Sequence, residues 1–485
     1  MKSFLLLTCL LTVCSLRSYA QTEEKGFEEQ KFSPDSLRVW TTDLMEAVAI
    51  SHPGMYRYTG KTTFRRLIDS TVNSITDSLT TLAYYRKLKP LFAQIGCLHT
   101  SISLSESYEE LLDESLQFIP IGIYINDKKQ AFVSHNYGEG PPLPPRAEIL
   151  SINGQPMAEI LRVLYRAIPS DGYNETLKTQ LLHYQFPHWY RSLISHDNSF
   201  VVELKEGGRT QRYTLAGVDA QAFPTMESLA RSDEPQLDLR IAEGTGWLTI
   251  RSFAKSTIRS NGQNYDAFLR QSFRTLEEEQ VKNLVIDLRN NTGGTDSHAV
   301  KLASYFFDEP FRYWQTVETT AQIAGQMKGL NLLFYRKPER EDSTYHWRGT
   351  RSWYSREFDF YQTQNPARNH RFGGKVYVLT NGFCMSSCSD VVAILSHNQK
   401  ATVVGQETGG GYQGNTSGLM PETDIFANLV MTIPLQKYTN AVDLDMQFGR
   451  GTQPDYTVAP TLEDWITAHD PVPTYVQQLI EQAKQ

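Results

Sequence analysis

The chain has 485 residues, a length that predicts about three domains, because single hydrophobic cores stop growing at about 250–300 residues. Its composition, 40% hydrophobic and 21% charged, is that of a globular protein and excludes a disordered chain. The net charge is −7, and it becomes −9 (45 basic against 54 acidic residues) without Lys2 and Arg17. This sign argues against a nucleic acid or an anionic membrane as partner.

Residues 1–20 predict a secretory signal peptide. Lys2 supplies the positive n-region, an apolar run extends from Phe4 to Val13, and a small-x-small cleavage site ends at Ala20. The run is too short to span a bilayer. A lipid anchor on Cys14 fits poorly because a bulky valine precedes it, and a buried first strand or helix is the remaining alternative. We expect cleavage near Ala20 and a periplasmic or secreted mature protein.

Residues 21–110 predict an N-terminal helical domain. Two runs of apolar residues recur at spacings of three and four, which is typical of amphipathic helices. The runs are Leu37, Trp40, Leu44, Ala47 and Val48, then Phe64, Leu67, Ile68, Val72 and Ile75. An alternating pattern at 101–104 predicts a strand.

Residues 111–235 predict a strand-rich domain. Apolar runs at 118–125 and 130–134 flank a polar turn, and a strand at 147–152 leads through Asn153-Gly154 into a helix. This strand, turn and helix are similar to the carboxylate-binding half of a PDZ domain. A PDZ-like fold is therefore one expectation, and a plain β-domain without a binding role is the other.

Residues 236–465 predict an α/β core, and a helix is expected at 466–485. A strand at 246–250 and a helix at about 265–279 begin the core. Two further apolar strands follow, and each ends in small polar residues that precede a helical pattern. Repeated strand–helix units favour a parallel sheet whose strand ends form the active edge. The polar segment 328–363 is interpreted as a lid or an insertion.

Four motifs lie in this core: VIDLRNNTGG at 285–294, VYVLTNGFCMSSCSD at 376–390, VVGQETGG at 403–410 and FGRGTQPD at 448–455. In this order they resemble the S41 family of serine peptidases, which contains the C-terminal (tail-specific) processing peptidases and the tricorn-core-like peptidases. The resemblance covers 240–465 well and the N-terminal half more loosely. It implies a crotonase-like ββα-type core, a polypeptide substrate, and hydrolysis by a serine without metal or organic cofactor.

The resemblance implies that Ser387 is the nucleophile, with Ser386 as the alternative. A serine-rich turn that only caps a helix is the structural alternative. Backbone amides of Cys388 and of Gly293 or Gly294 would form the oxyanion hole, where glycine lets the substrate approach closely. Asp287 and Arg289 are interpreted as an internal ion pair rather than as catalytic groups.

The general base is predicted to be His99. The processing branch takes a lysine after the third motif, but residues 401–436 contain no Lys or Arg, which excludes that design. The tricorn-like branch takes an N-terminal histidine, and Gly-Cys-Leu-His-Thr fits its motif with Cys97 where Asp is usual. His298 and His397 are alternatives, and both are expected to be exposed on helices.

The catalytic acid departs from the family pattern. The family has Glu before its closing motif, where this chain has Gln447 or Phe448. We predict Asp445, with Asp443 and Glu407 as the other nearby carboxylates, and the alternative is that Gln447 orients the imidazole without a charge. The missing Glu motivates an alternative function, a catalytically impaired S41-fold protein that binds peptides or acts as a scaffold. An acyl-CoA enzyme of the related crotonase fold is disfavoured because the chain is expected to be exported.

A disulfide is predicted from Cys97 to Cys384 or Cys388. If His99 meets Ser387, the three cysteines come to the same place, because residues 97 and 99 share a face of an extended segment. Three buried free cysteines are the alternative. No cysteine pair has a histidine at zinc-ligand spacing, so a metal site is not expected.

Overall fold

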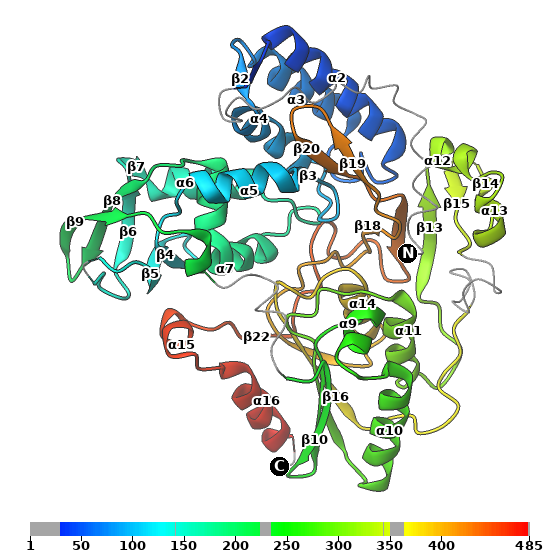
Figure 1. The fold of residues 1–485 in the computed structure, drawn as a ribbon. Coiled ribbons are helices and arrows are strands. Elements are labelled where there is room, and N and C mark those ends of the chain that lie inside the picture. Colours follow the sequence, from blue (N-terminus) through cyan, green and yellow to red (C-terminus); the bar gives the residue numbers. More distant parts are fainter. Residues whose placement is uncertain (1–29, 141, 224–233, 343, 350–362, 484–485) are drawn as a thin grey trace.

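The computed structural model describes residues 30–140, 142–223, 234–342, 344–349 and 363–483, which form a mixed α/β protein as predicted (Figure 1). The expected signal peptide at 1–20 and most of the second half of the 328–363 segment lie outside the described residues. None of the described helices combines the length and apolar character that crossing a membrane requires.

The core is a six-stranded sheet in the order β10-β11-β12-β16-β17-β22. Its strands are β10 (Leu237–Ala242), β11 (Thr245–Ile250), β12 (Asn283–Asp287), β16 (Lys375–Thr380), β17 (Thr402–Gly405) and β22 (Tyr456–Thr457). β10 and β11 pair antiparallel, whereas every other neighbouring pair is parallel. The carboxyl ends of β12, β16 and β17 therefore meet at one edge, where three of the motifs leave the sheet.

Helices cover both faces of this sheet, because successive strand residues point to opposite sides. Leu284 and Ile286 pack in one cluster with α9 (Lys255–Ser260), α10 (Tyr265–Glu278), α11 (Asp296–Ser304) and α14 (Ser387–His397). Val285 and Leu379 instead pack against α16 (Pro471–Gln482). The core helix expected at about 265–279 corresponds to α10, and α16 lies within the expected segment 466–485. A short helix, α15 (Leu462–Thr467), precedes α16.

The N-terminal region contains four helices among the described residues, and one of its strands pairs with the C-terminal half of the chain. It contains β1 (Lys31–Phe32), α2 (Pro34–Ser51), α3 (Lys61–Asn73), β2 (Leu79–Thr80), α4 (Thr81–Ala93), β3 (Ser101–Leu104) and α5 (Glu106–Ser115). β3 pairs antiparallel with β20 (Leu429–Thr432), which forms a hairpin with β19 (Glu422–Ile425). The hairpin therefore lies beside the N-terminal helices (Figure 1), and residues 96–100 directly precede the strand that it pairs with.

The strand-rich region forms a sheet in the order β4-β5-β6-β8-β9, with β7 on β6. Its elements are β4 (Ile121–Ile125), β5 (Ala131–Asn136), β6 (Glu148–Ile152), β7 (Gln155–Pro156), α6 (Met157–Ala167), α7 (Thr176–Leu193), β8 (Ser199–Glu206), β9 (Arg209–Ala216) and the 3-10 turn η2 (Ala220–Ala222). One hydrophobic cluster extends from Leu37 to Ile433 and joins this region to the N-terminal helices.

A third sheet in the order β14-β15-β13-β21-β18 lies beside the core. It is built from β13 (Trp314–Thr319), β14 (Glu339–Glu341), β15 (Thr344–His346), β18 (Thr416–Ser417) and β21 (Gln436–Asn440), with α12 (Ala321–Gln326) and α13 (Asn331–Phe334) between them in sequence. β18 matters most for the site, because it lies directly after the third motif.

Candidate active site

The second motif ends in a strained turn at the start of α14. Ser387 is the first residue of this helix, and Ser386 before it has φ 53° and ψ −133°. The amide of Cys388 donates to the carbonyl of Met385 at 3.0 Å. These features describe a type II′ turn, whose first central position favours glycine. A serine held there costs about 1–3 kcal/mol, and such strain is concentrated at functional sites.

The glycine pair of the first motif lies against this turn. A Cβ on Gly293 would be 2.8 Å from the carbonyl oxygen of Met385 and 3.1 Å from the amide nitrogen of Ser387. Gly293 also has φ 96°, so a side chain is excluded by space and by backbone conformation. The Ser387 side chain is buried, and its Oγ has no hydrogen-bond partner in the described part of the chain.

The oxyanion hole predicted from Gly293, Gly294 and Cys388 is not assembled in this structure. The Gly293 amide donates to Asn291 Oδ1 at 2.9 Å, and the Cys388 amide is used by the Met385 carbonyl within the turn. Only the Gly294 amide has no acceptor among the described residues, and Gly294 is exposed.

His99 lies in the loop between α4 and β3 and is half-buried. Its Nδ1 atom is buried and has no hydrogen-bond partner in the part of the chain that the structure describes. Burial lowers the pKa of His99 to about 4, against the opposing effect of the Thr416 carbonyl. The imidazole is therefore neutral at pH 7, the form that accepts a proton.

The carboxylate beside His99 is that of Asp171, which the sequence analysis missed. Asp171 lies in the loop between α6 and α7, and its oxygen, a ring nitrogen of His99 and the sulfur of Cys97 all lie within 4.8 Å of one another. Its two oxygens accept hydrogen bonds from the amides of Leu98 (3.0 Å) and Gly411 (3.1 Å). Burial raises the pKa of Asp171 to about 6, although these amides and Arg57 oppose the rise.

The third motif links this carboxylate to the serine turn. Gly410 donates to the carbonyl of Cys384 at 3.0 Å, and a Cβ on Gly410 would lie 3.0 Å from the amide nitrogen of Ser386. The next residue, Gly411, donates to Asp171. Adjacent glycines therefore contact the turn that carries Ser387 and the acid beside His99.

The acids predicted from the sequence lie elsewhere. Asp445 is exposed, its own amide donates to Asp443 Oδ1 at 2.9 Å, and no contact with His99 is recorded among the described residues. Glu407 is buried but accepts from Arg450, from Gly451 at 2.8 Å and from Asn174 at 3.1 Å, which is a structural arrangement.

The closing motif contacts the Asp171 loop directly. The ring of Phe448 packs against Tyr173 with centroids 6.4 Å apart. The amide of Tyr173 donates to the carbonyl of Gly449 at 2.7 Å. No motif or periodicity around residue 171 marks it in the sequence, because its position depends on this packing between distant loops.

The predicted disulfide is wrong, because Cys97, Cys384 and Cys388 are all free and buried. Cys97 donates to the carbonyl of Thr416 at 3.3 Å, whereas Cys384 donates to Leu288 at 3.0 Å. Cys97 belongs to the hydrophobic cluster of the N-terminal region, and the other two belong to that of the core sheet. The thiols of α14 and its turn thus point away from Cys97.

Three minor predictions have mixed outcomes. The ion pair of Asp287 and Arg289 is confirmed at 2.7 Å. His397 is exposed as expected. His298 is buried rather than exposed, and its Nδ1 lies 2.9 Å from the carbonyl of Phe253.

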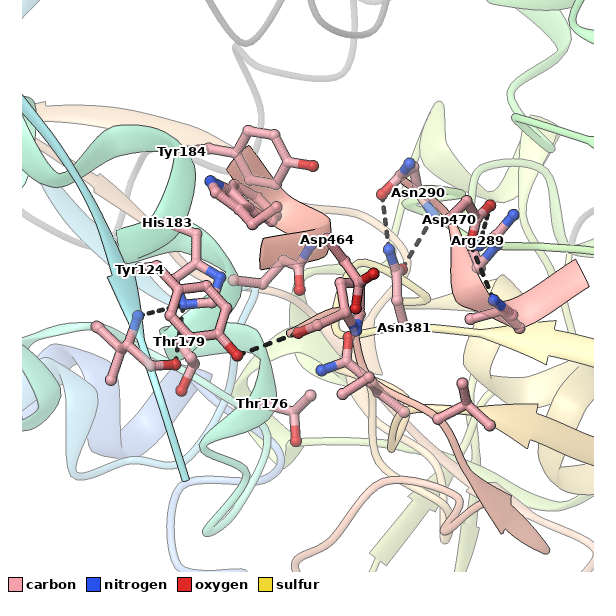
Figure 2. Close-up of a pocket in the computed structure, with 18 of the residues that line it drawn as sticks. Tyr124, Thr176, Thr179, His183, Tyr184, Arg289, Asn290, Asn381, Asp464 and Asp470 are labelled. Carbon is pink, nitrogen blue, oxygen red and sulfur yellow. Dashed lines mark hydrogen bonds and ion pairs between the residues drawn. The ribbon is translucent and has the colours of Figure 1, made fainter. Parts of the chain in front are cut away.

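A separate cavity of about 750 Å³ opens between the strand-rich region and the core (Figure 2). Tyr124 and His183 line it on one side, Arg289 and Asn381 on the other, and Asp464 of α15 lines it as well. Neither Ser387 nor His99 lines this cavity. It borders the motif loops at Asn290 and Asn381 but is distinct from the serine turn.

Comparison with known proteins agrees with this architecture. Residues 244–458 match Peptidase family S41. Mature CPAF complexed with lactacystin is similar over 93% of this chain and 98% of its own, with 11% identity and a TM-score of 0.64. Mature CPAF alone (90% and 95% covered, 11% identity, TM-score 0.60) and a CPAF mutant (90% and 95%, 10%, 0.61) are similar too. At such low sequence identities, the similarity to these structures supports the fold alone. The chain therefore carries a serine peptidase domain of family S41 at residues 244–458.

Proposed function

We propose that this chain is an exported serine peptidase in which Ser387 is the nucleophile, His99 is the general base and Asp171 orients His99. The observation that carries the proposal is the pair of contacts made by the last residue of the third motif and by the residue after it. Gly410 packs on the turn that precedes Ser387, and Gly411 donates to the carboxylate that lies beside His99.

In this mechanism the Ser387 Oγ attacks the carbonyl carbon of a peptide bond while the imidazole of His99 accepts its proton. The imidazolium then donates that proton to the leaving amine, and a water molecule hydrolyses the acyl-enzyme by the reverse sequence. Asp171 holds the ring in one orientation and stabilises its positive charge. It would take the part that the resemblance assigns to a Glu at the position of Gln447 or Phe448.

The oxyanion of the tetrahedral intermediate would be held by the amide of Gly294 and by that of Cys388. The second donor requires the Cys388 amide to leave the Met385 carbonyl, which is a rotation of the peptide within a strained turn. Substrate binding would supply the free energy for this rotation, because the developing oxyanion replaces a neutral acceptor with a charged one.

Labelling with a fluorophosphonate probe, followed by peptide mapping, tests the nucleophile. We expect an adduct on Ser387 in the parent and in Ser386→Ala, and none in Ser387→Ala. Hydrolysis of an unfolded casein-like substrate should fall about 10³-fold or more in Ser387→Ala. Equal hydrolysis by Ser387→Ala and the parent rejects the assignment. Amino-terminal sequencing of the protein from an exporting host should begin at Gln21, which tests the signal peptide.

A second candidate function is peptide binding without cleavage. It is favoured by the buried, unpartnered Oγ of Ser387 and by the use of the Cys388 amide inside its turn. The same experiment separates the two functions, because a binding protein leaves the probe unreacted while still retaining an unfolded polypeptide.

A further inference from the structure

The cluster at Asp171 has the ligand types of a transition-metal site. A thiol, an imidazole and a carboxylate, from Cys97, His99 and Asp171, present ligand atoms that all lie within 4.8 Å of one another. Zinc takes these three ligand types at about 2.0–2.3 Å, usually as a tetrahedron. Ligand atoms of such a tetrahedron are about 3.3–3.8 Å apart. Small side-chain rotations would therefore close the cluster around an ion.

Cys97 is buried as a thiol, so a metal ion bound there must displace its proton. Burial raises the pKa of Cys97 to about 12, and the neighbouring Thr100 opposes this rise. The Thr100 hydroxyl is oriented by His52. His52 Nδ1 accepts from the amide of Gly54 at 3.1 Å, so its Nε2 carries the hydrogen and donates to Thr100 Oγ1 at 2.8 Å. Such outer hydrogen bonds to a ligand are typical of metal sites.

The charges of the cluster also suit a divalent cation. A thiolate and a carboxylate together balance an ion of charge +2, and burial of a neutral assembly costs less than burial of either anion alone. The carbonyl of Thr416, which accepts from Cys97 and faces the His99 ring, directs its negative end into the same space. His99 Nδ1 has no protein partner among the described residues, and His99 is half-exposed, so an ion can reach it.

We propose that Cys97, His99 and Asp171 form a zinc-binding site with an open fourth position, and that zinc bound there switches the peptidase off. The metal acts by occupying the imidazole that would otherwise accept the proton of Ser387. The switch rests on the proposed role of His99 in catalysis, whereas the metal site itself does not.

Titration of the metal-stripped full chain with Co²⁺ tests the site independently of activity. A thiolate bound to Co²⁺ gives a charge-transfer absorption in the near ultraviolet. We expect this band in the parent and in Cys384→Ser, a matched buried cysteine that can keep its hydrogen bond to Leu288. Cys97→Ser should lose the band and bind Co²⁺ about 100-fold more weakly. Absence of the band in the parent, or its persistence in Cys97→Ser, overturns the site.

Hydrolysis measured with Zn²⁺ and with a chelator tests the switch. In the parent we expect the rate with Zn²⁺ to be about 100-fold lower than the rate with the chelator. In Cys97→Ser, at the same Zn²⁺ concentration, the ratio of the two rates should stay near one. Using the ratio removes any difference in the variant's own activity. Zinc that binds through Cys97 but leaves hydrolysis unchanged overturns the switch. If the chelated parent neither hydrolyses substrate nor reacts with the fluorophosphonate, the proposed function fails, while the Co²⁺ band still decides the metal site.

Discussion

Two buried carboxylates, Glu407 within the third motif and Asp171 beside the glycine that follows it, are used differently. Glu407 accepts hydrogen bonds from the Arg450 guanidinium, the Gly451 amide and the side chains of Asn174 before α7 and Thr176 at its start. Asp171 accepts two backbone amides, and its neighbours include Arg57, an imidazole with an unpartnered Nδ1 and a free thiol.

The difference separates a structural acid from a functional one. The four hydrogen-bond partners of Glu407 are all donors and one of them, Arg450, is a cation, so the carboxylate fastens the closing motif to the start of α7. The cluster at Asp171 retains an unsatisfied polar atom in a buried place, which native proteins rarely allow without a reason. Both acids would be counted as buried and polar, and only their partners distinguish them.

Among the variants that test this difference between Asp171 and Glu407, Asp171→Asn is expected to have the largest effect. The amide loses the charge that stabilises the imidazolium, so kcat should fall about 10²–10³-fold while KM changes little. The rate of fluorophosphonate labelling should fall in parallel, because it depends on the same proton transfer. A purely structural acid would instead change KM and thermal stability together, and that pattern would contradict the assignment.

Glu407→Gln should have the opposite effect, a loss of stability with reactivity retained. Loss of the negative charge leaves the Arg450 guanidinium unpaired, and we expect a loss of about 2 kcal/mol in unfolding free energy. A fully buried pair would lose more, but Arg450 is half-exposed. Thermal denaturation measures the change, and fluorophosphonate reactivity at a temperature where both proteins are folded should be retained.

Glu278→Gln, from the exposed pair with Arg274, is the control and should lose about 0.5 kcal/mol or less. Equal losses in the two variants would contradict the comparison.

Much of the core could be predicted from local sequence, because its signals are local. Strands such as β12 are short apolar runs that are buried on both faces, and each ends abruptly in glycine or small polar residues. The same local reasoning identified Gly293 beside the serine turn, since both lie where parallel strands end at one edge.

The acid and the thiols could not be predicted in this way. Asp171 reaches His99 because the loop after α6 packs against the closing motif, a contact between segments that are far apart in sequence. The disulfide was expected because Cys97 and Cys388 come to one neighbourhood, but proximity of segments does not set the direction of side chains. The first turn of α14 points Cys388 toward Leu288 and into the core.

The smallest expected effect comes from the backbone strain at Ser386, in the turn before the proposed nucleophile Ser387. The hydrogen bonds around Glu407 involve no such turn. Ser386→Gly should raise the unfolding free energy by about 1 kcal/mol, because glycine adopts the φ of 53° without steric cost, less its greater entropy in the unfolded chain. Ser386→Ala keeps the strain and removes only the hydroxyl, so it should give no such gain. Thermal denaturation of both variants measures the difference. If alanine stabilises the protein as much as glycine does, the hydroxyl rather than the backbone is the source of the strain. The backbone conformation of the turn would then give no argument for a functional role.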